Sequence, residues 1–107
     1  MERLVRKAKS APEAFAPNGK ILILAPAPIE EGYETTFVAG ENCVEKSKRL
    51  ALLYQEVAKR NGCEFLDAGS IPGVAMYPYD YMHLSLSAHQ KLAEKLAEVI
   101  VTILSSN

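Results

Sequence analysis

Ile21-Leu22-Ile23-Leu24-Ala25 is the stretch that decides the fold. It is a continuous apolar run, too short for a helix and without polar alternation, which is typical of a strand buried on both faces of a parallel sheet. Pro26-Ala27-Pro28-Ile29 ends the run abruptly. In open α/β sheets, loops that leave the carboxyl ends of strands line the ligand site. This proline-rich loop is therefore either one wall of a site or simply a rigid exit from the strand.

A helix and a second strand follow this run. Residues 42–61 carry apolar side chains at helical spacing, and Asn61-Gly62 is a stop signal for the helix. The predicted buried face comprises Cys43, Ser47, Leu50, Leu53, Tyr54, Val57 and Ala58. Residues 63–67 then predict a short strand, and residues 68–70 form the exit from it. A strand, a crossover helix and another strand form a βαβ unit, which is nearly always right-handed.

Two further helices flank this unit. Residues 1–10 predict a short amphipathic helix, and the last helix begins near Ser85 or Ser87 and runs to about Leu104. Either Ser85 caps this helix, or Ser87 does so in a capping box with Gln90. Its core face comprises Ala88, Leu92, Leu96, Val99, Ile100 and Ile103. Further apolar residues widen the stripe near the end of the helix, which predicts burial on two sides.

The composition indicates a single ordinary globular domain. The chain has 107 residues, a hydrophobic fraction of 49% and a formal net charge of -1. This balance gives no sign of nucleic acid or an anionic membrane as a partner. No apolar run reaches the roughly 18–20 residues of a membrane helix, and the first residues do not form a signal peptide, so a cytoplasmic location is expected. Cys43 and Cys63 are too few for a disulfide scaffold, and we expect no bridge between them.

Asp80 and His83 are the residues best suited to catalysis. A histidine side chain can take up and return a proton near neutral pH, provided that an acceptor holds one ring nitrogen. A carboxylate three residues earlier in a turn can reach back and do this. Both residues lie after a predicted strand and before a helix, where α/β sites form. A turn aspartate and a surface histidine would give the same spacing.

The block Asp80-x-x-His83-Leu84-Ser85, followed by Ala88-His89, resembles the last sequence block of the SGNH (GDSL-type) esterases and acylhydrolases. The proline-ended strand at residues 21–28 and the helix and strand up to residue 70 resemble the family in the same order. The likeness is closest to the small arylesterases and acetylesterases, and it covers the C-terminal half of the family's domain. It implies a partial flavodoxin-like three-layer α/β sandwich, with two parallel strands and about three helices.

The resemblance also implies residue roles. His83 would be the general base toward a serine and then the acid toward the leaving alcohol, while Asp80 would orient His83. The family often has glycine directly after the aspartate, whereas this chain has Tyr81. The tyrosine ring would either shape the acyl or alcohol pocket or cap the turn. No cofactor and no metal are expected.

The nucleophile of such an enzyme is missing from these residues. The family carries its serine in a Gly-Asp-Ser block and its oxyanion donors in a glycine and a Gly-x-Asn-Asp block, and none of these occurs here. We therefore expect a C-terminal half that is inactive alone, whether it is a truncation, a proteolytic remnant or a shortened gene product. Its partners would be a small ester, once the N-terminal half is supplied, and a second copy in a homo-oligomer. The alternative is a non-catalytic α/β module that binds a partner or assembles with itself.

Three other groups of residues are weaker candidates for function. Asp80, His83 and His89 have donor types that suit zinc or iron, although His89 fits a helix residue equally well. Asp67, at the end of a strand, either touches a site or bonds a neighbouring loop. An aromatic patch would line a substrate pocket or a subunit contact, and it comprises Met76, Tyr77, Tyr79, Tyr81 and Met82.

Overall fold

The computed structural model describes residues 1–11, 19–30, 40–77 and 81–106. Within these ranges the predicted βαβ unit is confirmed. Strand β1 (Leu22–Ala25) is followed by helix α3 (Cys43–Asn61) and strand β2 (Glu64–Asp67). The two strands are parallel, with Leu22 opposite Glu64 and Ala25 opposite Asp67. Gly62 ends α3 in the left-handed conformation, with φ at 64°, and glycine adopts this conformation without steric cost.

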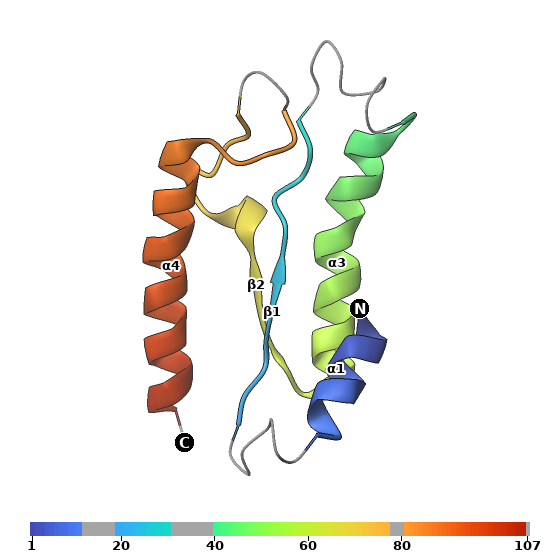
Figure 1. Cartoon of the computed structure of the whole chain (residues 1–107), viewed down its shortest axis with the longest axis vertical. Coiled ribbons are helices and arrows are strands. Elements are labelled where there is room, and N and C mark those ends of the chain that lie inside the picture. The colour runs from blue at the N-terminus through green and yellow to red at the C-terminus, as the bar shows by residue number, and fades with distance from the viewer. Residues whose placement is uncertain (12–18, 31–39, 78–80, 107) are drawn as a thin grey trace.

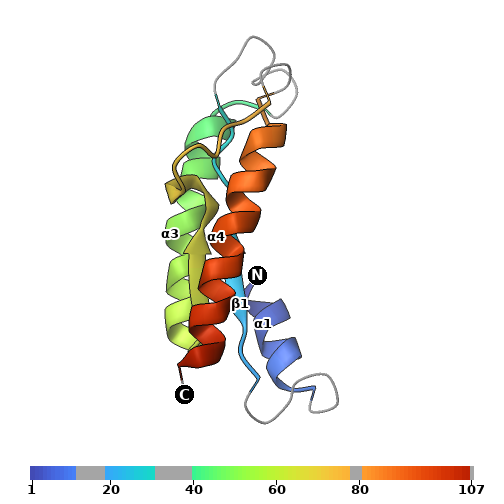
Figure 2. The same ribbon diagram turned by 90° about the vertical axis from the view of Figure 1, so that its left-hand side faces the viewer.

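The elements form three layers, as expected. Helices α1 (Glu2–Lys9) and α3 lie on one side of the two strands, and helix α4 (Leu86–Ser105) lies on the other (Figure 1). Figure 2, a view from the α4 side, places α4 in front of the strands and α3 behind them. A single turn of 3-10 helix, η1 (Ala68–Ser70), follows β2 directly. We call the α1–α3 layer and the sheet face that it covers the α3 side, and the opposite layer and face the α4 side.

A buried hydrophobic cluster lies on the α3 side. Val5, Ile23, Val57 and Ala58 form a buried cluster that joins α1, β1 and α3. Partly buried hydrophobic residues pack against it: Ile21, Tyr54, Cys63 and Phe65. Successive residues of a strand point to opposite faces, so the neighbours of Ile23, Leu22 and Leu24, face α4. These two leucines are only half-buried. The prediction that β1 is buried on both faces is therefore wrong for the α4 side, because α4 covers that face incompletely.

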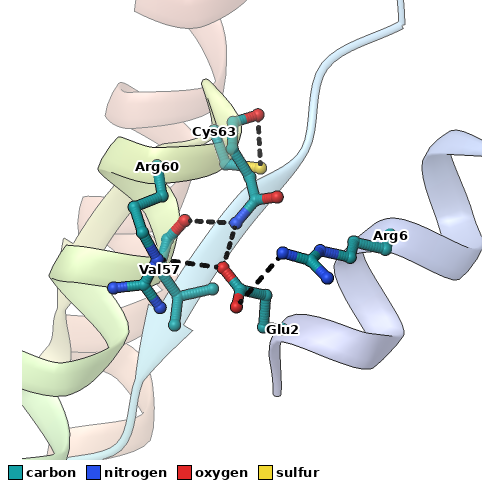
Figure 3. Close-up of polar contacts among 6 residues, drawn as sticks. Glu2, Arg6, Val57, Arg60 and Cys63 are labelled. Carbon is teal, nitrogen blue, oxygen red and sulfur yellow. Dashed lines mark hydrogen bonds and ion pairs between the residues drawn. The ribbon is translucent and has the colours of Figure 1, made fainter.

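A polar contact fastens α1 to the end of α3 (Figure 3). Glu2 Oε2 accepts hydrogen bonds from Arg60 Nε at 3.1 Å and from Asn61 Nδ2 at 2.8 Å. The Arg60 hydrogen bond, assisted by that of Asn61, lowers the pKa of the Glu2 carboxyl group, and the same contact raises the pKa of Arg60. Asn61 Nδ2 also donates to the Val57 carbonyl at 2.8 Å. Helix α1 is thus held both by the buried Val5 and by this polar contact.

Helix α4 begins at Leu86, and Ser85 is its cap. Ser85 Oγ accepts a hydrogen bond from Ala88 N at 3.1 Å, which satisfies one of the free amides of the first turn. The alternative capping box of Ser87 with Gln90 is therefore wrong, and Ser87 Oγ instead lies 3.3 Å from Ser85 Oγ. Among the described residues, no helix is both long enough and apolar enough to cross a membrane.

The predicted helix faces are only partly correct. Leu53 of α3 and Ile100 of α4 are exposed, although both fall on a predicted core face. Within α4 only Ala88 is fully buried, and Leu92, Leu96, Val99 and Ile103 are half-buried. Helical spacing identifies a face, but burial also requires another element to cover that face. No disulfide joins Cys43 and Cys63, as expected.

Candidate functional site

The carboxyl ends of β1 and β2 lie side by side, because Ala25 pairs with Asp67 in the parallel register (Figure 1). The segments that leave these ends pack closely. A Cβ atom at Gly69 would lie 2.7 Å from Pro28 Cδ, which leaves no room for a larger residue. Asp67 Oδ1 accepts a hydrogen bond from Gly69 N at 2.9 Å, and this shapes η1. Asp67 thus bonds the turn that directly follows β2, and the proline-rich loop packs against that turn.

Residues 75–77 and 81–85, which together we call the His83 segment, are joined by hydrogen bonds. Met76 and Leu84 form an antiparallel bridge. Tyr77 N donates to the His83 carbonyl, and Ser85 N donates to the Ala75 carbonyl at 3.0 Å. These bonds fix the backbone of His83 immediately before α4, and the residue itself is exposed. His83 is therefore held at its backbone while its imidazole remains accessible.

Tyr81 has the left-handed backbone conformation, with φ at 60°. Its N–H donates to the Tyr77 carbonyl at 2.8 Å, and its own carbonyl accepts from Glu30 N at 2.9 Å. A side chain disfavours this conformation, whereas glycine does not. The backbone at this position thus gives a physical reason for the glycine that the resembling family often carries there. The tyrosine is half-buried, as is Met82.

The other sequence candidates divide into described and undescribed residues. Asp80 and Tyr79 lie outside the described residues. His89 is exposed in the first turn of α4, Met76 is buried and Tyr77 is exposed. Within the described ranges, no three histidine, cysteine, aspartate or glutamate side chains lie close enough together to hold a metal ion.

All seven serines are described, and each hydroxyl makes a local hydrogen bond. Ser47 is buried, and its Oγ accepts from Ile29 N at 2.9 Å and donates to the Val44 carbonyl at 2.8 Å. Ser70 Oγ donates to the Asp67 carbonyl at 2.7 Å. These are structural roles at turns and helix ends, and they agree with the absence of a nucleophile motif around any serine.

Glu30 is a residue of this region that the sequence reasoning missed. Its segment has no hydrophobic period, so the pattern predicts only a loop. In the structure, the Glu30 carboxylate accepts a hydrogen bond from Met76 N at 2.9 Å. The only sequence feature that could have pointed to Glu30 was its place as a charged residue directly after the proline-rich exit of a strand.

The chain is similar to solved esterase structures. It is 34% identical to a protein assigned as an arylesterase from Agrobacterium tumefaciens, with a TM-score of 0.77 over 96% of this chain and 49% of that one. It is 33% identical to a carbohydrate acetylesterase family member from Sinorhizobium meliloti, with a TM-score of 0.80 and the same coverage of 96% and 49%. An aryl esterase from M. smegmatis shares the fold at 21% identity and a TM-score of 0.73, over 94% of this chain and 49% of that one.

The chain spans about half the length of these structures. No family model matches it, and no curated protein is close enough to count as a relative. The solved structures nevertheless confirm the resemblance to the SGNH esterases that the sequence indicated, and their coverage is consistent with a C-terminal half. They also confirm the α/β fold class.

Proposed function

We propose that this chain carries the acid–base half of a serine ester hydrolase. His83 acts as the general base, and Asp80 orients its imidazole. The observation that carries the proposal is the position of His83: a hydrogen-bonded segment holds it immediately before α4, with its side chain exposed. The 34% identity to a protein assigned as an arylesterase supports the same reaction class. Small carboxylic esters are the proposed substrates.

The proposed chemistry divides the reaction between two segments of polypeptide. His83 takes the proton from a serine hydroxyl as the serine attacks the ester carbonyl, and then gives it to the leaving alcohol. The serine and the oxyanion donors come from Gly-Asp-Ser and Gly-x-Asn-Asp blocks that these 107 residues do not contain. Loss of one oxyanion donor alone lowers a rate by about 10²–10³. Loss of the nucleophile removes covalent catalysis, so these residues alone are inactive.

Complementation tests this proposal. The chain is mixed with a polypeptide that carries the first half of an arylesterase domain, and hydrolysis of nitrophenyl acetate is followed. Activity should appear only in the mixture, and His83→Ala should abolish it. His89→Ala is the matched control, because His89 is an exposed histidine only six residues further along. Equal losses in the two variants, or activity of the 107 residues alone, would contradict the proposal.

A second candidate function is self-assembly without catalysis. The observation in its favour is the apolar surface of α4, where Ile100, Val101 and Leu104 are 45%, 64% and 68% exposed. Among the described residues each strand also has only one neighbour, so each has a free edge. Light scattering at micromolar concentration should show a dimer or larger species, and a monodisperse monomer would contradict self-assembly.

The cytoplasmic location stays a prediction.

A further inference from the structure

Glu30 contacts the His83 segment at two residues, Met76 and Tyr81. It ends the described loop that leaves β1, and its backbone N–H donates to the Tyr81 carbonyl at 2.9 Å. Its Oε2 atom accepts from Met76 N at 2.9 Å. Met76 lies in residues 75–77 of the segment, and Tyr81 lies in residues 81–85. One residue therefore contacts the segment at two separate points.

The geometry of the bridge explains why Met76 needs this contact. In an antiparallel pair of this kind, the hydrogen bonds are made by the residues on either side of the bridged pair. The N–H of Met76 consequently points away from Leu84. Met76 is buried, and a buried N–H without an acceptor is costly. The Glu30 carboxylate supplies the acceptor, and a charged acceptor makes a stronger bond than a neutral one.

The residue before Glu30, Ile29, connects the same loop to helix α3. Ile29 N donates to Ser47 Oγ at 2.9 Å, and Ser47 is a buried residue of α3. Two consecutive amides thus donate to different parts of the molecule: Ile29 N to α3, and Glu30 N to the His83 segment. The loop therefore connects α3 with the His83 segment through hydrogen bonds.

We propose that Glu30 is a positioning residue that sets where His83 stands relative to the carboxyl ends of the strands. The part of this inference that concerns catalysis rests on the proposed function. A displacement of about 1 Å at a reacting group can lower a rate by about 10²-fold, so the backbone contacts of a general base matter to its chemistry. Glu30 acts through Met76 and Tyr81 and does not itself touch the ester.

The test compares four forms of the chain: wild type, Glu30→Ala, Glu30→Gln and Glu41→Ala. Glutamine keeps an acceptor oxygen of the same reach, and Glu41 is an exposed glutamate immediately before α3. NMR then measures hydrogen exchange at Met76 N and the ring signals of His83 at fixed pH. In Glu30→Ala we expect exchange at Met76 to rise about tenfold, and the His83 ring signals to move. Glu41→Ala should match the wild type in both, and Glu30→Gln, which keeps a neutral acceptor, should lie closer to the wild type than Glu30→Ala does.

The outcomes separate this inference from the proposed function. If Glu30→Ala leaves Met76 exchange and the His83 signals unchanged, the inference is overturned. If Glu30→Ala does not fold, Glu30→Asp replaces it, since the shorter side chain withdraws the acceptor and keeps the charge. Wild-type His83 signals in Glu30→Asp would likewise overturn the inference. In the complemented complex, Glu30→Ala should lower kcat more than it changes KM. If the complemented wild type shows no ester hydrolysis, the proposed function fails, and the NMR result still decides the role of Glu30.

Discussion

The two sides of the sheet differ in how completely they are packed. On the α3 side, α1, β1 and α3 share a buried cluster, and Glu2 of α1 also accepts hydrogen bonds from the end of α3. On the α4 side, Ala88 is the only fully buried residue of a 20-residue helix. The α3 side thus contains the buried cluster, whereas on the α4 side most of the helix is exposed or half-buried.

Truncation of one apolar residue on each side is the strongest test of this difference. Ile23→Ala, on the α3 side, should lower the free energy of unfolding by about 2–5 kcal/mol, because it removes buried methyl groups and leaves a cavity. Leu104→Ala, on the α4 side, should change it by less than about 0.5 kcal/mol, because Leu104 is 68% exposed. Urea denaturation measures both. Similar losses would mean that the two sides are packed equally.

Removal of the cap of α4 should have an intermediate effect. Ser85→Ala should cost about 1 kcal/mol, because the hydrogen bond from Ala88 N to Ser85 Oγ is lost. Ser87→Ala is the matched control and should stay within about 0.5 kcal/mol. Circular dichroism and urea denaturation check this pair. If Ser87→Ala proved the more harmful of the two, the assignment of the cap would have to be reversed.

The strained position in the His83 segment offers a smaller effect of opposite sign. Tyr81→Gly should stabilise the chain by about 0.5 kcal/mol, because glycine avoids most of the cost of a positive φ and this gain exceeds the loss of ring packing. Tyr77→Gly, at an ordinary backbone conformation, should destabilise it. Thermal unfolding measures both variants. A loss of stability in Tyr81→Gly would show that ring packing outweighs the backbone strain.

The smallest expected effect is the pH dependence of the α3 side. The pKa of Glu2 is lowered in the folded state, so its contribution is present above its ordinary pKa of 4.5 and is lost as the pH falls through the lower folded value. Glu2→Gln should therefore reduce the loss of stability on acidification, measured by urea denaturation from pH 7 to pH 3. Glu64→Gln, on the exposed start of β2, should reduce it less. Identical curves for the two variants would contradict this role of Glu2.

Local patterns in the sequence predicted the elements well. The apolar run at residues 21–25 and the Asn61-Gly62 stop gave the correct strand–helix–strand order, because both signals depend on neighbouring residues alone. The choice between Ser85 and Ser87 required the geometry of the first turn of α4. The exposure of Leu53 and Ile100 depends on which other element covers each helix, and helical spacing carries no information about that.

The candidate site was predicted less completely than the fold. His83 stands where the motif indicated, immediately before α4, whereas Asp80 lies outside the described residues and its orienting role stays a prediction. The contacts of Glu30 join residues 46 positions apart, from Glu30 to Met76. Such a contact arises from tertiary packing, and no short pattern in a single sequence specifies it.

The sparse burial of α4 also has a consequence for how the molecule opens. Backbone hydrogen bonds inside a helix are lost together when the helix detaches, and the free energy of that opening reflects the surface that holds it. Along α4 only Ala88 is fully buried, the apolar residues further along the helix are at most half-buried, and an exposed bond from Lys20 Nζ to the Ser106 carbonyl, at 3.2 Å, lies just beyond its last turn. We therefore expect α4 to behave as a separate cooperative unit that opens well before the α3 core unfolds. Its free state would expose the α4 face of β1 to solvent.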